Sequence, residues 1–548
     1  MKKPAFLSLR PLAFILLSAL LLSACGSTSL VSTPLENIDS VPLKISDLDD
    51  AQKKRWGHAD LLRDTIPGMS VDRAYAELLP NLKPREKVVV AVLDSGIDLT
   101  HEDLDGVLWV NAKEVPGNGK DDDGNGYTDD VHGYNFLGES LYEQLEFARI
   151  LRLGRGDAAL QAKAKAELEK ELPEAGANKQ RYEQILQVVQ GADAAVKEHL
   201  GKDSYTKEEV MAIETSDATL QQQLGVLQQM YNFEDSIGGV MEQLEGGVDY
   251  FTKQLNYHLN VDFNGREAVG DDPYDLNDRG YGNGNPMNRA EDESHGTHVA
   301  GIIAAERGNG LGVDGVADYV QLMSVRMVPD GDEYDKDVAL GIRYAVDNGA
   351  RVINASFGKS FSPNSEWVFE ALKYAASKNV LFVHAAGNDG LDLDDPENAN
   401  FPNDQVATGP EIADNVITVG SLDQTYGSEM VSSFSNYGAS NVDVFAPGGG
   451  IYSTMPGGEY EFQGGTSMAA PAVSGIAALI LSRFPQLTAA QVKKIIMQSG
   501  LPVKSPVIVA GDEDNSKPFS SISRSGKIAN AYNALILADK VANGKVAL

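Results

Sequence analysis

Cysteine is almost absent from this 548-residue chain, in which Cys25 is the only one. A single cysteine excludes a disulfide within the chain. Positive charge is also scarce, because 46 Lys and Arg residues stand against 79 Asp and Glu residues, for a formal net charge of −33. A chain of this charge repels phosphates, which argues against nucleic acid and anionic membrane surfaces as partners. The same acidity suits a protein that holds divalent cations.

The first apolar run, "PLAFILLSALLLSA" (11–24), is shorter than the ~20 residues that a membrane span needs. It follows Lys2, Lys3 and Arg10 and ends in small residues, which is the pattern of a secretory signal peptide over residues 1–24. Its end, "LSAC", resembles the lipobox of bacterial lipoproteins, which implies lipidation of Cys25. The alternatives are an ordinary signal peptide and a membrane-spanning helix. Lipidation would hold the protein at the cell envelope through an N-terminal anchor, and Gly26 in place of Asp favours an outer membrane.

Apolar, β-branched runs alternate with amphipathic helical segments from residue 87 onward. Runs that are apolar on both faces are typical of strands in a parallel sheet that is covered by helices on both sides. The hydrophobic content of 42% is enough for one large core or two smaller ones. The sequence therefore predicts an α/β fold. The predicted strands are residues 87–93, 321–327, 351–357, 380–387 and 416–421.

Residues 139–257 interrupt this pattern, because they are rich in Glu, Gln, Lys, Ala and Leu and have almost no strand signal. Apolar residues recur there at helical spacing, and Thr206 with Glu209 matches a capping box. We expect an all-helical insertion of four to six helices. A decoration packed on the core, a lid, a docking surface and an inhibitory element all remain open.

Three short blocks place polar residues where strands end or helices begin. "GGTSMAAP" (464–471) puts Ser467 at the start of a long apolar helix, "SHGTHVAGI" puts His295 at the start of another, and "VVVAVLDSGID" drives a strand into Asp94. Alone, Ser467 would be a helix cap and His295 a structural residue. Together they suit a nucleophile, its base and a carboxylate that orients the base.

The blocks "VAVLDSGID", "HGTHVAG" and "GTSMAAP", in that order, resemble the active-site blocks of the subtilisin-like serine proteases, the subtilases. The resemblance covers residues 85–136 and 260–500. It implies a three-layer sandwich with a mostly parallel central sheet. It also implies that Asp94 orients the imidazole, that His295 is the general base and acid, and that Ser467 is the nucleophile. His298 would be structural.

The resemblance extends to the groups that bind substrate. Asn388 in "VHAAGNDG" matches the asparagine of the oxyanion hole, although alone it would be a turn former after a glycine. Two further segments, 356–358 and 385–387, match those that line the first specificity pocket and bind an extended peptide. Their small, apolar character fits a preference for apolar side chains. The predicted substrate-binding residues are Ser356, Phe357, Gly358, Ala385, Ala386 and Gly387.

An acidic segment, "NGKDDDGNGYTDDVHGYNF" (118–136), precedes the insertion. Its oxygen-bearing residues alternate as in a calcium loop, but His132 stands where an EF-hand has glutamate. Calcium is therefore expected here, and a solvated Asp/Gly-rich turn is the alternative; residues 269–285 are a weaker candidate of the same kind. The predicted metal ligands are Asp121, Asp123, Asn125, Tyr127 and Asp129.

The resulting hypothesis is a lipid-anchored serine endopeptidase that cleaves protein and peptide substrates through an acyl-enzyme, without an organic cofactor. The predicted organisation is a signal peptide (1–24), a tether or extension (25–84), the first part of the catalytic domain (85–138), the insertion (139–257) and the remainder of the catalytic domain (258–548). Two alternatives remain. One is a narrow processing protease gated by the insertion, and the other is a non-catalytic surface lipoprotein that binds a partner on a protease scaffold.

Overall fold

The computed structural model describes residues 47–289, 293–405 and 409–548. The predicted signal peptide and Cys25 lie outside the described residues. A nine-stranded sheet in the order β10-β13-β7-β6-β5-β4-β1-β3-β2 forms the centre, and all its neighbours are parallel except β10 and β13. Its strands are β1 (Val88–Asp94), β2 (Gly133–Asn135), β3 (Val320–Arg326), β4 (Ala350–Ala355), β5 (Leu381–Ala385), β6 (Val416–Leu422), β7 (Val444–Pro447), β10 (Leu501–Pro502) and β13 (Lys527–Ile528).

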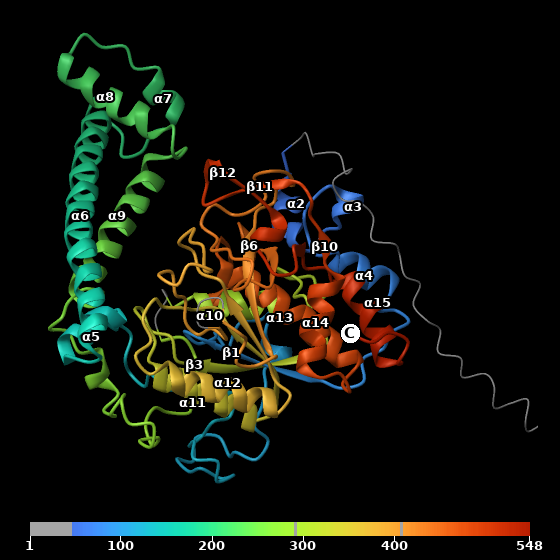
Figure 1. Cartoon of the computed structure of the whole chain (residues 1–548). Coiled ribbons are helices and arrows are strands. Elements are labelled where there is room, and N and C mark those ends of the chain that lie inside the picture. The colour runs from blue at the N-terminus through green and yellow to red at the C-terminus, as the bar shows by residue number, and fades with distance from the viewer. Residues whose placement is uncertain (1–46, 290–292, 406–408) are drawn as a thin grey trace, which may run out of the picture.

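Helices cover both faces of the sheet, which confirms the predicted three-layer α/β fold (Figure 1). Val90 and Val92 of β1 pack into one core with α10 and α13, whereas the intervening Ala91 and Leu93 pack into a second core with α11 and α12. This split follows from the two-residue repeat of a strand. The first layer contains α10 (His295–Ala304), α13 (Thr466–Arg483), α14 (Ala489–Ser499) and α15 (Ala531–Ala542), and the second contains α11 (Asp335–Asp347) and α12 (Ser365–Ser377).

Helix α13 runs through the first core. Among the described residues it is the one helix long and apolar enough to cross a membrane, but 94% of it is buried inside the protein. A core helix passes the same test, so α13 is read as the central helix of its layer.

Residues 47–84 fold against the body instead of hanging free of it. Trp56 is 1% exposed, and its indole N–H donates to the carbonyl of Gly450 at 3.1 Å. The segment contains α2 (Asp50–Arg55), α3 (Leu61–Asp64), α4 (Val71–Glu77) and a 3₁₀ turn at Trp56–His58.

The region predicted as an insertion is helical (Figure 1). The long helix α6 lies beside α9, and both project away from the sheet with α7 and α8 at the far end. The capping box of Thr206 and Glu209 is formed at the start of α7. The helices are α5 (Glu146–Leu153), α6 (Ala158–Leu200), α7 (Lys207–Met211), α8 (Ala218–Met230) and α9 (Ile237–Lys253), followed by a π-helical turn at Gln254–His258.

Two hairpins lie outside the central sheet and were not among the predicted strands. They are β8 (Ile451–Met455) with β9 (Glu459–Gln463), and β11 (Pro506–Val509) with β12 (Asp512–Pro518). Short 3₁₀ turns complete the described elements at Asp105–Val107, Gly265–Ala268, Pro456–Gly458 and Phe519–Ser521.

Candidate active site

Asp94 and His295 form a hydrogen-bonded pair at the carboxyl edge of the sheet. Asp94 is the last residue of β1 and is 1% exposed, and His295 begins α10. The imidazole Nδ1–H donates to Asp94 Oδ1 at 2.7 Å, and the N–H of Ser95 donates to the same oxygen at 2.8 Å. A carboxylate at the end of an apolar strand is costly to bury without such donors. The pair fixes the tautomer in which Nε2 is free to accept a proton.

The carboxylate also sets the charge of the imidazole. Burial lowers the pKa of His295, but the attraction and the hydrogen bond from Asp94 outweigh it, so the pKa is raised above its ordinary value of 6.5. His295 is therefore a stronger base than a free imidazole.

Ser467 is the second residue of α13 and exchanges hydrogen bonds with Ser356. The Ser467 hydroxyl donates to the carbonyl of Ser356 at 3.1 Å, and the Ser356 hydroxyl donates to the carbonyl of Ser467 at 2.8 Å. Ser356 follows β4, whose Ala355 pairs with Leu93 of β1. Neighbouring strands lie about 4.8 Å apart, so Ser467 and His295 stand over adjacent strand ends.

The predicted hydrogen-bonded line of three groups is only half formed. Asp94 is the one hydrogen-bond partner of the His295 ring among the described residues. The Ser467 hydroxyl donates its hydrogen bond to the backbone carbonyl of Ser356. A hydroxyl has a single proton, so it cannot donate to both groups at once. The Ser467 O–H must therefore turn away from the Ser356 carbonyl before it can donate to His295.

Asn388 is held with its amide nitrogen available. Its Oδ1 accepts from both the N–H and the hydroxyl of Thr466, each at 2.9 Å, and the Thr466 hydroxyl accepts from the N–H of Gly387 at 3.0 Å. Since Oδ1 is occupied, Nδ2 is the group that Asn388 can present to a ligand. The N–H of Ser467 lies in the first turn of α13, where the helix provides no carbonyl for it.

A pocket of about 600 Å³ opens beside Ser467 and Asn388. Four of the six predicted substrate-binding residues line it: Phe357, Gly358, Ala385 and Gly387. The other two do not. The Ala386 side chain is fully buried in a core, and the Ser356 hydroxyl faces Ser467, so these two support the pocket from behind.

The helical region also contributes to the lining of this pocket. Lys163, Glu167, Lys170 and Glu171, from the first four turns of α6, line it together with Asp332. We call these four α6 residues the α6 wall. Sequence reasoning missed them, because an exposed helix rich in Glu and Lys carries no sign of the surface that it faces.

His298 has no catalytic contact. It is fully buried, and its Nε2–H lies 3.0 Å from the carbonyl of Ile451 and 3.2 Å from that of Glu461. Burial lowers its pKa to about 4, so it stays neutral and ties the β8–β9 hairpin to α10.

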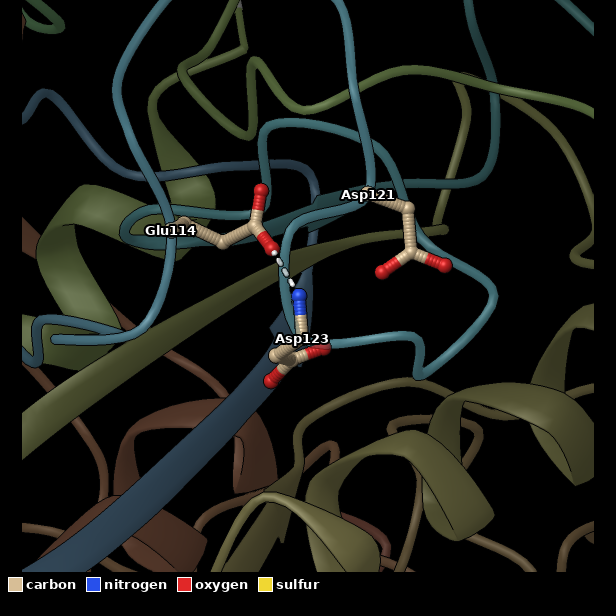
Figure 2. Close-up of side chains that lie close together, drawn as sticks. All are labelled: Glu114, Asp121 and Asp123. Atoms are coloured by element: carbon tan, nitrogen blue, oxygen red, sulfur yellow. Dashed lines mark hydrogen bonds between the residues drawn. The ribbon is translucent and has the colours of Figure 1, made fainter.

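Three carboxylates in the acidic segment lie close together. Glu114, Asp121 and Asp123 each bring an oxygen within 4.8 Å of the others (Figure 2). Glu114 Oε1 accepts from the N–H of Asp123 at 3.1 Å, whereas Oε2 is buried without a hydrogen-bond partner. Asp121 and Asp123 were predicted as ligands, and Glu114 was not.

The other three predicted ligands, Asn125, Tyr127 and Asp129, lie outside this group of carboxylates. Asp129 turns back to accept from the N–H groups of Asn118 and Gly119, and Asn125 Oδ1 accepts from the N–H of Tyr127. The Tyr127 ring packs edge-on against Tyr134 and other aromatic rings. Asp121 and Asp123 are thus the two predicted ligands that lie in the group of three carboxylates, and the five-residue ligand set stays a prediction.

In the weaker metal candidate, residues 269–285, the buried carboxylate of Asp271 forms ion pairs with two cationic side chains. Asp271 accepts from Arg266 at 2.6 Å and from Lys336 at 2.6 Å. Among the described residues, Glu114, Asp121 and Asp123 are the one group of three or more such side chains with metal-binding spacing.

Residues 85–520 match the model of the Peptidase_S8 family, described as the subtilase family. The thermophilic serine proteinase of Bacillus sp. (strain AK1) is 38% identical over 249 residues, which are 45% of this chain and 53% of that protein. Thermitase of Thermoactinomyces vulgaris is 41% identical over 190 residues, 34% of this chain and 61% of that protein. Subtilisin BL of Lederbergia lenta is 37% identical over 223 residues, 40% of this chain and 75% of that protein. The chain thus spans little more than half the length of the first two relatives.

Proposed function

Because the chain belongs to the subtilase family, we propose that it is a serine endopeptidase in which Asp94, His295 and Ser467 act together. The observation that carries the proposal is the 2.7 Å hydrogen bond between Asp94 and His295, next to a helix-terminal serine that opens into a pocket. The substrates would be proteins and peptides.

The reaction follows from the groups at the sheet edge. Ser467 turns from Ser356 to His295, His295 Nε2 takes its proton, and Ser467 Oγ attacks the peptide carbonyl carbon. The oxyanion accepts hydrogen bonds from the N–H of Ser467 and from Asn388 Nδ2. His295 then protonates the leaving amine, and an ester on Ser467 remains. Water hydrolyses this acyl-enzyme by the same steps, while the Asp94 carboxylate stabilises the imidazolium.

Labelling of Ser467 with a fluorophosphonate, together with casein hydrolysis, tests this proposal. We expect both in the full chain and neither in Ser467→Ala. Ser482→Ala is the matched control, because Ser482 lies on the same helix and donates to the carbonyl of Leu479, far from the pocket. A folded protein that is not labelled in the presence of calcium would favour the non-catalytic surface lipoprotein.

A narrower processing role is the second candidate. The specific observation in its favour is the α6 wall, which lines the same pocket as Ser467. A processing enzyme would cleave a few peptide sequences rapidly and casein slowly, and a peptide-library cleavage profile measures this directly.

We also propose calcium as a structural ion of the acidic segment. The unpartnered oxygen of Glu114 and the carboxylates of Asp121 and Asp123 are the hard oxygen ligands that Ca²⁺ prefers. Bound there, the ion would cancel the repulsion among these carboxylates and hold the loop to the sheet. Metal binding measured by isothermal titration in Glu114→Gln and in the unchanged chain tests this.

Membrane attachment through Cys25 is proposed from the sequence "LSAC" alone. Metabolic labelling with a radioactive fatty acid tests it, because Cys25→Ser is expected to lose the label and leave the membrane fraction. Retention of the label in Cys25→Ser would contradict the assignment.

A further inference from the structure

The pocket beside Ser467 has two chemically different groups of lining residues. One group is Ala385, Gly387 and Asn388 with Ser467, and the other is the α6 wall. A side chain on the residue whose carbonyl Ser467 attacks would enter this shared pocket. What this side chain meets decides which peptide bonds are cleaved, so the inference below rests on the proposed endopeptidase function.

Other parts of the pocket lining are apolar or small, and they include Phe147, Phe357, Gly358 and Phe361. A Cβ at Gly358 would lie 2.3 Å from Asn400 Oδ1, so glycine there leaves room for the Asn400 side chain. A long side chain can bury a methylene stem along such walls and keep a charged head beyond them.

The pocket lining carries an excess of negative charge. Five carboxylates line the pocket against three lysines, and the lysines are already engaged. The exposed Lys170 pairs with Glu167 at 2.9 Å, and Lys163 donates to the carbonyl of Glu397 at 3.2 Å. Lys359 forms buried ion pairs with Glu146 and Asp335. The lining carboxylates are Glu167, Glu171, Asp332, Asp389 and Glu397.

Glu171 and Asp332 have no ion-pair partner within 4.0 Å in the described part of the chain. The Asp332 carboxylate accepts one hydrogen bond there, from the N–H of Glu146 at 2.7 Å. Burial and the neighbouring Glu167 raise the pKa of Glu171 to about 7. A positively charged ligand would relieve this repulsion.

Helix α5, which shares a core with the start of α6, is fixed to the body of the protein by buried hydrogen bonds and ion pairs. Arg149 of α5 donates to the carbonyls of Asp332 and Glu333 at 2.6 and 2.9 Å. Lys359, which follows the Phe357–Gly358 segment, donates to Glu146 of α5 at 2.7 Å and pairs with Asp335 at 2.9 Å. All these side chains are buried. Because α5 and the start of α6 share a core, this attachment also holds the α6 wall in place beside the pocket.

We propose that the α6 wall makes this enzyme select lysine or arginine at the residue whose carbonyl is attacked, through the carboxylates of Glu167 and Glu171 with Asp332. This differs from the apolar preference that segments 356–358 and 385–387 alone suggest. Those segments supply small and apolar parts of the pocket lining, whereas the α6 wall belongs to a helix that is distant in the sequence.

Peptide substrates that differ only at this residue test the proposal. We expect kcat/KM for lysine and arginine to exceed that for leucine in the full chain. Removing charge-assisted hydrogen bonds costs about 10–100-fold, so the ratio of lysine to leucine should fall by that factor in the double variant Glu167→Gln, Glu171→Gln. Glu171→Lys should favour glutamate at the same position, which keeps the test informative if the double variant folds poorly.

Glu183→Gln is the matched control. Glu183 lies on the same helix about 18 Å further along, where it is exposed and pairs with Lys179. The ratio of kcat/KM for lysine to that for leucine in Glu183→Gln should equal the ratio in the unchanged chain. Labelled Ser467 together with a leucine preference, or a ratio that the Glu167 and Glu171 changes leave intact, would overturn this inference alone. Absence of labelling would overturn the proposed function itself.

Discussion

Ser467 and Ser356 each donate a hydrogen bond to the other's backbone carbonyl, at 3.1 and 2.8 Å. The Ser356 hydroxyl also accepts from Asn354 Nδ2 at 3.0 Å. Ser356→Ala would release the carbonyl of Ser467 and leave the buried Asn354 amide without this acceptor, which costs about 1–3 kcal/mol of folding free energy. Because the start of α13 would be less well positioned, we expect kcat to fall about 10–100-fold with KM nearly unchanged.

Ser482→Ala separates positioning from stability. The Ser482 hydroxyl is buried, donates to the carbonyl of Leu479 and accepts from Arg483 at 2.7 Å. Its loss should lower stability by a similar amount without changing kcat. Equal kcat values for the two variants, measured well below their unfolding temperatures, would contradict a positioning role for Ser356.

The oxyanion donor can be tested in two steps. Asn388→Ala removes the Nδ2 donor, and loss of one such donor lowers kcat by about 10²–10³-fold. Thr466→Val retains the donor but removes the hydroxyl that fixes Asn388 Oδ1, so kcat should fall by a smaller factor. Steady-state kinetics on one peptide rank the variants, and a larger loss in Thr466→Val than in Asn388→Ala would contradict the assignment.

The pH dependence should report the Asp94–His295 pair. Neutral His295 is required, so kcat/KM should rise with pH, with a midpoint above 6.5, because Asp94 raises the pKa of the imidazole. The same pair stabilises the fold fully below about pH 6.5, and this stabilisation is lost as the pH rises through the raised value. Asp94→Asn leaves burial as the main influence and should move the His295 pKa below 6.5. NMR titration of the ring in Ser467→Ala and in Ser467→Ala, Asp94→Asn measures both values, and an unchanged pKa would contradict this electrostatic origin.

The sheet was largely predictable from sequence, because buried parallel strands are continuous apolar runs. Residues 416–421, for example, were predicted as a strand, and β6 spans Val416–Leu422 with every residue buried. β13, which lies next to the edge strand β10, has two residues, and β9 alternates polar with aromatic residues, so neither is a continuous apolar run. In the helical region, the helical spacing of apolar residues predicts that Val188 faces the core of that region. It is 52% exposed, because α6 is covered on part of its surface only.

The site divides in the same way. Asp94, His295 and Asn388 could be located because each lies at the end of a strand or at the start of a helix with a distinctive neighbouring sequence. Glu171 could not, since its role depends on how α6 packs against the segment after β4. Glu114 was missed because it precedes the alternating acidic residues by seven positions, and the backbone must turn to bring it to Asp121.

Calcium should stabilise the protein through Glu114. An ion present at 100 times its Kd adds about 2.7 kcal/mol, which corresponds to a rise in Tm of about 2–3 °C for a chain of this size. Scanning calorimetry with calcium or with EGTA measures this rise, and Glu114→Gln should reduce it. Asp129→Asn is the control, because its carboxylate binds the N–H groups of Asn118 and Gly119 instead of joining the cluster. Equal loss of the calcium effect in both variants would restore the loop predicted from sequence.

The outer part of the helical region, residues 183–246, should be dispensable for catalysis. Its core, which includes Val189, Leu227 and Val240, is separate from the core at the base, which includes Phe147 and Ala164. Tyr182 of α6 lies against Gly247 of α9, where an added Cβ would come within 2.3 Å of the ring. A short glycine and serine linker can therefore replace residues 183–246, which removes the outer core and keeps the α6 wall.

This shortened protein should label at Ser467 at the same rate and keep its ratio of kcat/KM for lysine and leucine, because every pocket residue precedes position 183 or follows position 246. Glu183→Gln in the full-length chain provides the reference for a change at the cut site. If casein hydrolysis rises severalfold in the shortened protein while the peptide ratio stays constant, the outer part restricts access of large substrates, as the gated processing alternative requires. If the ratio of kcat/KM for lysine and leucine falls, the position of the α6 wall depends on the outer core, and the inner and outer parts of the helical region act as one unit.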